Sequence, residues 1–495
     1  MVFVQGAFAA LFAFFFLIPI AVDAYTREGD WAGFAFALFV CVVVGIACLL
    51  NGKSGRIGRR EAVYLVCAIW VMLPMLAAIP FVVSSTTQLS YIDALFEAMS
   101  GLTTTGATVL SNLPDKSSGI LLWRAMLNFI GGLGVVAVGM LLLPFLKVVG
   151  LRDVYGTESA SARQYKFGNF GTVLCITCLY VVLLVMCALA YRVVGMSVFD
   201  ALCHAMSTVS TGGFANYDSS LGYFNSAAVE VIAIVFMLLS SCPFVAYLGL
   251  IFDGRFQFGQ FAVFVCMMAV FSLLVAINLY SKGTFVGADF LSVLRSTTFQ
   301  LVSLATSTGF VNCDYSAWGF LATLCTILTL CGGCSGSTNS GLKIYRVVIL
   351  IRCGYAHVRG ILSRGHTTEL ATKLLREEAL LPEVGAFFFV YVFVFCVACI
   401  LVSWDRDDFA TIVTSVSATL SNTGPGVGEV IGPIGTYASL STTVKSVLIV
   451  LMLIGRLELV PVALLFSLLQ SSAGRLSRIR ERARKCLLCF DNHIR

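Results

Sequence analysis

The sequence predicts an all-α polytopic membrane protein, in which four helix–loop–helix repeats surround a pseudo-fourfold axis and two transmembrane helices precede them. Three observations predict this fold class. The 495-residue chain is 59% hydrophobic and only 12% charged. It contains a series of apolar runs of about 20 residues, the length that crosses a bilayer as a helix. A short apolar segment that ends in hydroxyl residues and a glycine also occurs four times. A soluble globular protein is therefore excluded.

Ten apolar runs predict spanning helices. The first run lacks the positively charged start of a signal peptide, so we interpret it as a spanning helix. After a leading pair, the chain repeats a unit of one span, one short apolar segment, a turn and a second span. The predicted spans cover residues 3–22, 31–50, 62–84, 119–146, 171–194, 225–251, 260–281, 317–351 (interrupted), 385–403 and 441–469.

The repeats have a period of roughly 100 residues, which is the length of one such unit. This period predicts the domain organisation. Residues 1–52 form two leading helices, 53–150 the first repeat, 151–254 the second, 255–365 the third with a broken second helix, 366–473 the fourth, and 474–495 a basic cytoplasmic tail.

The four short segments are too short to cross a bilayer, so each must enter and turn back at membrane depth. Non-helical backbone at that depth is tolerated only where it is buried in protein or lines water. A central aqueous cavity lined by the four turns follows. Aligning the turns on their Thr-Gly pairs makes four glycines equivalent, namely Gly106, Gly212, Gly309 and Gly424. The predicted filter residues are Thr103, Thr104, Thr105, Gly106, Val209, Ser210, Thr211, Gly212, Thr306, Ser307, Thr308, Gly309, Ser421, Asn422, Thr423 and Gly424.

These residue types suit a monovalent cation. Rings of backbone carbonyls can replace the water shell of an ion without binding it as tightly as carboxylates would. Glycine allows the backbone turn, and no acidic residue lies within the filter segments, which argues against a pore for divalent ions. Asp93 and Asp200 stand where helix N-caps belong, so the carbonyl ends of the short helices point toward the centre. The alternative is that small residues merely allow tight helix packing.

Charge orients the chain. Basic residues crowd the loops after the second, fourth and eighth spans and the C-terminal tail, whereas the opposite side carries mostly acids. The positive-inside rule therefore predicts that both termini are cytoplasmic. The bases that define the inner side include Lys53, Arg56, Arg59, Arg60, Lys147, Arg152, Arg163, Lys166, Arg352, Arg359, Arg364, Lys373, Arg376, Arg475, Arg478, Arg480, Arg482, Arg484 and Lys485.

The 18 cysteines lie mostly within apolar runs, where they behave as small hydrophobes, and no disulfide framework is expected. Cys331 and Cys334, like Cys486 and Cys489, have the spacing of redox or metal sites. No second pair of Cys or His lies close by in sequence to complete a zinc site. No nucleophile–base pair is visible, so neither an enzyme nor a cofactor bound to this chain is predicted, and no nucleic-acid partner is expected.

Over essentially its whole length the chain resembles the TrkH/TrkG potassium uptake subunits of the superfamily of K+ transporters, and more distantly KtrB and fungal Trk. The motifs that carry this resemblance are Thr103–Thr108, Asn128–Val135, Ser207–Phe214, Gly332–Thr338 and Leu453–Glu458. The resemblance implies potassium bound at the filter residues, a homodimer with one pore in each protomer, and a bacterial inner-membrane location. It also implies a cytosolic TrkA-type regulatory subunit, which would carry the nucleotide.

A glycine-rich run interrupts the eighth span. It lacks the Gly-Lys-Ser/Thr ending and the preceding strand of a phosphate-binding loop. The resemblance makes it an intramembrane gate under the filter, with Asn339 and Ser340 where relatives usually carry glycine; a simple kink is the alternative. This interrupting loop consists of Gly332, Gly333, Cys334, Ser335, Gly336, Ser337, Thr338, Asn339, Ser340 and Gly341.

Arg456 lies inside the last span, where a charge is usually functional. The resemblance implies a cavity barrier that interacts with the gate; a structural ion pair with a buried carboxylate is the alternative. Lys343 and Arg346 are interpreted as markers of the cytoplasmic membrane face.

Two titratable residues, Glu97 and His204, lie in the short helices next to the filter. Hydrogen bonding within the scaffold is favoured for both over proton coupling. Residues 353–382 have amphipathic spacing and mixed charge, which makes this segment the best candidate for docking a cytosolic partner.

The sequence thus predicts a gated potassium conduit in which the membrane potential draws the ion inward. The second hypothesis is a secondary transporter, a symporter that couples K+ to H+ or Na+. Such transporters typically show inverted repeats and binding sites on broken helices. The four short segments here all enter from one side, which favours the conduit.

Overall fold

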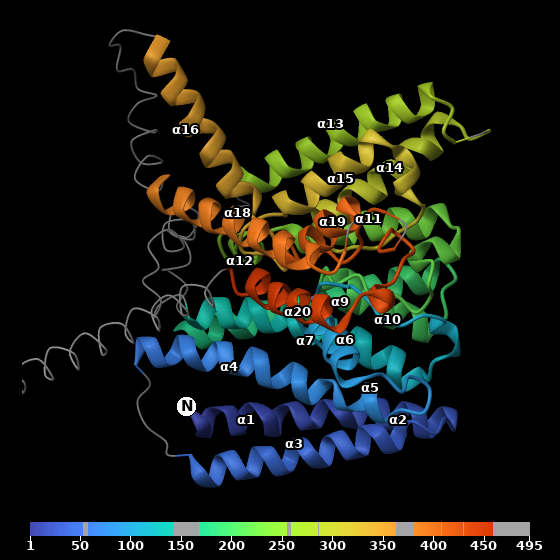
Figure 1. Ribbon diagram of the computed structural model, residues 1–495, viewed down its shortest axis with the longest axis vertical. Coiled ribbons are helices and arrows are strands. Elements are labelled where there is room, and N and C mark those ends of the chain that lie inside the picture. Colours follow the sequence, from blue (N-terminus) through green and yellow to red (C-terminus); the bar gives the residue numbers. More distant parts are fainter. Residues whose placement is uncertain are drawn as a thin grey trace, which may run out of the picture.

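The computed structural model describes residues 1–52, 58–142, 168–254, 259–285, 287–362, 381–406, 408–428 and 430–458. Within these ranges the regular secondary structure is helical, and many of the long helices run in roughly the same direction across the molecule (Figure 1). Apolar residues dominate the long helices, because a helix can satisfy all of its backbone hydrogen bonds internally inside a membrane.

Among the described residues, six helical segments are long and apolar enough to span a membrane, which confirms a polytopic membrane protein. They lie in six of the ten predicted ranges. They are Val2–Thr26 (α1 Val2–Ala13, η1 Phe14–Phe16 and α2 Leu17–Thr26), Trp31–Asn51 (α3), Glu61–Val83 (within α4 Arg59–Ala77 and α5 Ile79–Val83), Gly171–Val193 (within α9 Gly168–Val193), Gly259–Ser281 (α13) and Leu381–Ser403 (α18).

The other predicted spans are also helical. Ser118–Leu142 forms α7 and Thr442–Arg456 forms α20. The interrupted span consists of α15, Phe320–Cys331, and α16, Ile344–Leu362. The break in this span therefore lies at the predicted glycine-rich loop.

The prediction of one continuous span over residues 225–251 is wrong. Two helices, α11 (Ala227–Ser241) and α12 (Phe244–Asp253), meet there at a bend of 81°. Pro243 lacks a backbone N–H and disfavours the helical conformation for the residue before it. Cys242 accordingly adopts an extended backbone conformation, with ψ of 139°. The bend supplies a seventh candidate span if the pair is counted as one.

The four short segments form helices that are too short to cross a bilayer. They are α6 (Tyr91–Leu102), α10 (Val198–Val209), α14 (Phe290–Ala305) and α19 (Phe409–Leu420). The predicted N-caps need correction. Ser90 and Ser197 are the N-caps, and their hydroxyls accept hydrogen bonds from the amides of Asp93 and Asp200. The two acids lie in the first turn, where a carboxylate still opposes the positive helix end.

The short helices join the long ones in a closed ring. Each of them packs against the long helix before it, the helix after it, and the helix that follows the short helix of the preceding repeat in the ring. The sets are α6 with α4, α7 and α20; α10 with α9, α11 and α7; α14 with α13, α15 and α11; and α19 with α18, α20 and α15. Because α6 packs against α20, the fourth repeat closes on the first.

The leading helices lie at the edge of this ring, where α1 and α3 pack against each other (Figure 1). Acids near the end of α2 and in the turn that joins it to α3 fasten the leading helices to the first repeat. Asp30 accepts hydrogen bonds from the hydroxyls of Ser84, Ser85 and Thr86. Asp23 and Glu28 accept the first amides of α7, a favourable place for carboxylates.

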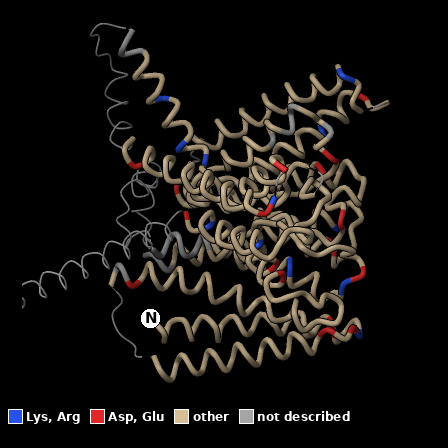
Figure 2. The backbone as a smooth tube through the Cα atoms, viewed as in Figure 1, with Lys and Arg blue, Asp and Glu red and all other residues tan. Residues whose placement is uncertain are grey.

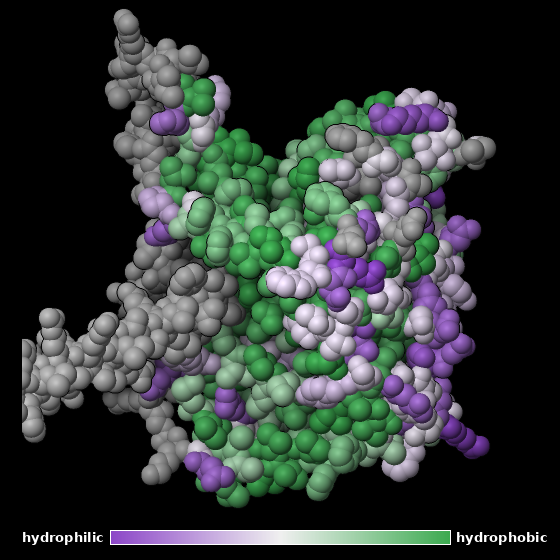
Figure 3. All heavy atoms as spheres, in the orientation of Figure 1, coloured by the Kyte–Doolittle hydropathy of each residue, from purple (hydrophilic) through white to green (hydrophobic). Residues whose placement is uncertain are grey.

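The surface is that of a membrane protein. Figure 2 shows long helices that are largely uncharged along their middle stretches, and Figure 3 shows broad apolar faces with hydrophilic residues gathered along one edge. Large apolar side chains such as Phe14, Leu189 and Phe389 are exposed. Apolar surface of this extent is stable where lipid covers it.

Candidate functional site

The four turns that follow the short helices share one backbone conformation. In each, the amides of three consecutive residues donate to helix carbonyls in the same order. The second residue is left-handed in all four turns, with φ of 52° or 53°, and the fourth is a glycine with φ between 75° and 92°. We call these four turns the turn ring. It consists of Thr103–Gly106, Ser210–Gly213, Thr306–Gly309 and Ser421–Gly424.

This conformation corrects the sequence alignment in the second repeat. Alignment on Thr-Gly made Gly212 equivalent to the other three glycines. The amide of Gly212 instead bonds the carbonyl of Ser207, as the third residue of each other turn does, and Gly213 has the positive φ. Val209 consequently belongs to the last turn of α10, one residue before the ring.

Asn128 explains why the third residue of the second turn is glycine. A Cβ atom on Gly212 would come closer than 3.0 Å to the side chain of Asn128, which α7 supplies. The Asn128 amide also donates to the hydroxyl of Ser207, at 3.3 Å. In the other three turns a threonine occupies this third position. The side chain of Asn128 thus fills the volume that a threonine fills elsewhere.

The glycines interlock the four turns. A Cβ atom on any of them would lie closer than 3.0 Å to the carbonyl oxygen of the third residue in the next turn. Gly106 faces Gly212, Gly213 faces Thr308, Gly309 faces Thr423, and Gly424 faces Thr105. Because the last of these contacts returns to the first turn, the carbonyl-bearing backbones meet around one axis at van der Waals distance. No residue with a side chain fits at these positions.

Hydroxyl groups stiffen three of the turns from within. The first and third side chains are 2.7 Å apart between Thr103 and Thr105, and 2.7 Å apart between Thr306 and Thr308. The corresponding distance between Ser421 and Thr423 is 3.1 Å. These side chains are fully buried, so they shape the turns from within the protein.

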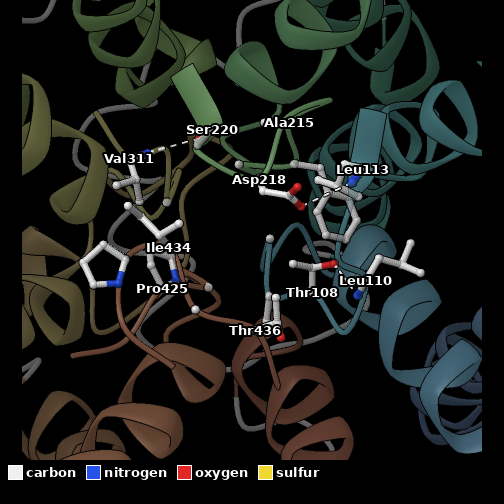
Figure 4. A pocket seen from close by; sticks show the side chains of 18 of the residues that line it. Thr108, Leu110, Leu113, Ala215, Asp218, Ser220, Val311, Pro425, Ile434 and Thr436 are labelled. Carbon is white, nitrogen blue, oxygen red and sulfur yellow. Dashed lines mark hydrogen bonds between the residues drawn. The ribbon is translucent and has the colours of Figure 1, made fainter. Parts of the chain in front are cut away.

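A pocket opens on one side of the turn ring, and residues from all four repeats line it. Figure 4 shows Thr108, Ala215, Val311 and Pro425, one from each repeat, around a common space. The four ring glycines lie among the lining residues. The ring is therefore accessible from this pocket, as the mouth of a conduit requires.

The interrupting loop, Gly332–Gly341, lies directly against the turn ring. The hydroxyls of Thr338 and Thr211 are 3.1 Å apart, and the amide of Ser340 donates to the hydroxyl of Ser307 at 3.0 Å. Thr211 and Ser307 are the left-handed second residues of their turns. The loop thus contacts the second and third repeats at equivalent positions.

The bend in the second repeat anchors the other side of the loop. The Asn339 side chain bonds the hydroxyl of Ser241 at 2.9 Å, the Thr338 hydroxyl donates to the carbonyl of Ser240 at 3.3 Å, and the amide of Phe244 donates to the carbonyl of Gly336 at 3.0 Å. Sequence reasoning missed this function of residues 240–244. The Cys242–Pro243 step within an apolar run was the available signal.

Arg456 binds the loop from the last helix. Its guanidinium donates to the Thr338 carbonyl at 2.9 Å and to the Ser340 hydroxyl at 2.8 Å, and it reaches the Gly131 carbonyl of the first repeat at 3.4 Å. The side chain is 3% exposed. Within the described residues it forms no ion pair with a carboxylate, so the alternative of a structural pair finds no partner there.

Lys343 and Arg346 form ion pairs just after the loop, and their place at the cytoplasmic membrane face remains a prediction. Both bind Glu458, which lies just beyond the end of α20, and the Arg346–Glu458 distance is 2.7 Å. The Arg346 guanidinium also lies over the ring of Phe387, 4.0 Å from its centroid. These contacts fix the start of α16 against the last helix and α18, immediately after the loop.

Glu97 and His204 are both buried and hydrogen-bonded within the protein. His204 bonds the carbonyl of Asp200 at 2.8 Å, one turn earlier in its own helix. Glu97 pairs with Arg124 of α7 at 2.8 Å. Sequence reasoning missed Arg124, although a lone arginine within the apolar run 119–146 was the signal.

Several predictions lie outside the described residues. They include most of the bases that orient the chain, Cys486 and Cys489, the basic tail, and residues 363–380 of the candidate docking segment. The repeat boundaries, the orientation of the termini and the docking segment remain predictions.

Comparison with known proteins agrees with the geometry. Residues 33–476 match a family model described as TrkH, cation transport protein. The chain is 33% identical over 475 residues to the Trk system potassium uptake protein TrkH of Halomonas elongata, with 94% of this chain and 97% of that protein aligned. It is 30% identical to TrkG of Escherichia coli, with 93% and 96% aligned. The crystal structure of the potassium transporter TrkH from Vibrio parahaemolyticus superimposes with a TM-score of 0.84 at 29% identity, covering 94% of this chain and 97% of that one.

Proposed function

We propose, from the premise that this chain belongs to the TrkH family of cation transport proteins, that it takes up potassium through the turn ring. A cation transport protein is a transporter and not an enzyme, in agreement with the prediction from the sequence. The Halomonas and Escherichia relatives are named for potassium uptake in the Trk system. Potassium is therefore the proposed cargo.

One observation carries this proposal: four turns from four repeats interlock through glycine and carbonyl contacts around one axis. A dehydrated monovalent cation needs several oxygens at once, and carbonyl dipoles supply them without a fixed charge. Helices α6, α10, α14 and α19 all end at these turns, so their negative ends stabilise a cation at the centre.

The interrupting loop is the proposed gate. It lies against two turns of the ring and is held by Arg456, whose charge opposes a cation on the same path. Displacing the loop would release these hydrogen bonds and remove backbone from beneath the ring. Arg456 is accordingly the proposed cavity barrier.

The remaining parts of the proposal follow from family membership. They are a bacterial inner-membrane location with both termini cytoplasmic, a homodimer with one pore in each protomer, and a cytosolic TrkA-type subunit that binds the regulatory nucleotide. The apolar outer faces of the six spanning helices support a multi-pass membrane protein.

The test is electrical. The purified full chain is reconstituted into liposomes or a planar bilayer, and reversal potentials are measured under gradients of K+, Na+ and pH. If the chain is an uncoupled conduit, the reversal potential should follow the K+ gradient and should not shift with pH at constant K+. A potential that shifts with the proton or sodium gradient in a fixed ratio would support the coupled secondary transporter instead. Absence of K+ flux with and without the cytosolic subunit would refute the proposed function.

A further inference from the structure

One position in each short helix holds a buried polar side chain behind the turn ring. Glu97, His204, Gln300 and Ser415 each lie six residues before the first residue of their turn, and all four are fully buried. Glu97 alone carries a carboxylate at this position. Its partner, Arg124 of α7, is 2% exposed. The first repeat therefore departs from the other three at an equivalent place.

The Glu97 carboxylate holds the chain where it leaves the first turn. It accepts the Thr108 hydroxyl at 2.9 Å and the Val109 amide at 2.9 Å. Thr108 lies two residues after Gly106. These bonds use both carboxylate oxygens, since the Val109 amide binds Oε2 and the Arg124 Nε binds Oε1.

Arg124 makes comparable contacts with the residues that follow the second turn. Its Nη1 donates to the Ala215 carbonyl at 2.7 Å, and its guanidinium lies 4.2 Å from the centroid of the Phe214 ring. Its Nη2 returns to the Thr108 hydroxyl at 3.2 Å. Phe214 and Ala215 directly follow Gly213. One ion pair therefore clamps the segments that directly follow two neighbouring turns, which we call the exits of these turns. Thr108 and Ala215 both line the pocket above the ring (Figure 4).

Neutral groups brace the exits of the other two turns. The Tyr437 hydroxyl donates to the Gly424 carbonyl of the fourth turn at 2.7 Å, and the Ser303 hydroxyl donates to the carbonyl of Phe310, directly after the third turn, at 2.7 Å. Charge-assisted hydrogen bonds are shorter and stronger than such neutral ones. Breaking a buried ion pair also leaves an uncompensated charge, which is strongly destabilising. The two exits held by this pair therefore have few other accessible conformations.

We propose that Glu97 and Arg124 are a positioning pair that sets the cation selectivity of the turn ring, by fixing the spacing of the first and second turns. The inference rests on the proposed conduction through this ring. Gly106 abuts the carbonyl of Gly212 across the clamped boundary. Potassium and sodium differ in radius by a fraction of an ångström, so the spacing and stiffness of these carbonyls decide which ion they suit.

The experiment measures the K+/Na+ permeability ratio from bi-ionic reversal potentials of the reconstituted full chain. The ratio does not depend on how much folded protein is present, so a merely structural role would not change it. Glu97→Gln keeps the size of the side chain but removes its charge. We expect its ratio to fall by about tenfold, the equilibrium effect of losing one charge-assisted hydrogen bond.

Two further variants complete the design. Thr108→Val keeps the ion pair and the shape of Thr108 but detaches it from the exit of the first turn, so its ratio should fall by several fold. If Glu97→Gln does not fold, the permeability ratio of Thr108→Val tests the inference in its place. Asp93→Asn is the matched control, because Asp93 pairs with the buried Lys445 across the boundary between the fourth and first repeats without touching a turn. Its ratio should stay at the wild-type value.

The outcomes separate this inference from the proposed function. A wild-type chain that carries no potassium current would refute the function itself. A conducting wild type with unchanged ratios in both Glu97→Gln and Thr108→Val would overturn the inference and leave the function standing. An equal fall in Asp93→Asn would also overturn it, because any buried pair between repeats would then have the same effect.

Discussion

The turn ring and the interrupting loop lie against each other but are built in opposite ways. The ring consists of four near-identical turns, and each is held by the next through backbone contacts that leave no room for a Cβ atom. The loop occurs once, and side chains from separate repeats hold it, among them Ser241, Ser307 and Arg456. The loop is also held by a backbone hydrogen bond, from the amide of Phe244 to the carbonyl of Gly336. A ring of repeated contacts and a loop held by single hydrogen bonds fit the proposed fixed filter and movable gate.

The largest effect should come from the ring glycine that alignment missed. Gly213→Ala places a Cβ atom against the carbonyl of Thr308 at a φ of 75°. Strain of this kind costs about 1–3 kcal/mol before any clash, so potassium flux into proteoliposomes should fall below roughly a tenth of the wild-type value.

Gly212→Ala is the matched comparison for this variant. Its Cβ atom would meet the Cγ, Nδ2 and Cβ atoms of Asn128. Asn128→Ala removes the two nearest of these, so the double variant Gly212→Ala/Asn128→Ala should recover part of the flux that Gly212→Ala loses. A greater loss in Gly212→Ala than in Gly213→Ala would restore the original alignment and contradict the ring described here.

The next effect concerns the charged anchor of the loop. Arg456→Ala removes the bonds to Thr338 and Ser340 together with a buried charge on the proposed path. Hydrogen bonds from charged groups contribute roughly 1.5–3 kcal/mol, so resting potassium flux should rise by about tenfold. Arg346→Ala, which breaks a pair with Glu458 beyond the loop, should raise it much less. Loss of folded protein without any rise in flux would assign Arg456 a structural role only.

A smaller effect tests the contact between the two regions. Ser307→Ala and Thr211→Val each remove one neutral hydrogen bond between ring and loop, worth about 1 kcal/mol. Open probability in single-channel recordings should rise by roughly fivefold or less.

Thr104→Val changes the equivalent residue of the first turn. Within the described residues Thr104 forms no hydrogen bond to the loop, so this variant should match the wild type in open probability. Equal increases in all three variants would mean that the turns, and not their bonds to the loop, control opening.

The smallest effect on transport should come from Asp30, which lies far from both regions. Burial alone would raise the pKa of Asp30, but hydrogen bonds from Ser84, Thr86, Ser85 and Ser117 lower it to about 2. Asp30→Asn should leave flux and selectivity unchanged while lowering the free energy of unfolding at pH 7 by about 1–3 kcal/mol.

The pH dependence of this difference has a definite sign. A carboxyl whose pKa is lower in the folded state stabilises the fold above its unfolded pKa and loses that contribution as the pH falls through its folded pKa. The difference in unfolding free energy between wild type and Asp30→Asn should therefore be constant above about pH 5 and shrink as the pH falls toward 2. Thermal unfolding in detergent at a series of pH values measures it. A difference that grows on acidification would refute this assignment.

The sequence by itself determined the parts of the fold that depend on local composition and on repetition. Apolar runs identify the spanning helices because hydrocarbon excludes an unpaired backbone, and four short segments ending in hydroxyl residues and glycine mark the turns. The break near Gly332 was also predicted and Arg456 was singled out, since polar or flexible residues inside an apolar run stand out against their neighbours.

Only the tertiary structure decided which atoms meet. Thr-Gly alignment could not distinguish Gly212 from Gly213, because the choice depends on the side chain of Asn128 in another helix and on the carbonyl of Thr308 in the next repeat. The same holds for the bend at Pro243, which delivers the amide of Phe244 to the loop. Contacts between successive repeats join residues about a hundred positions apart, and the closing contact of Gly424 with Thr105 joins residues about three hundred apart. No local pattern encodes them, since their geometry arises only when the ring closes.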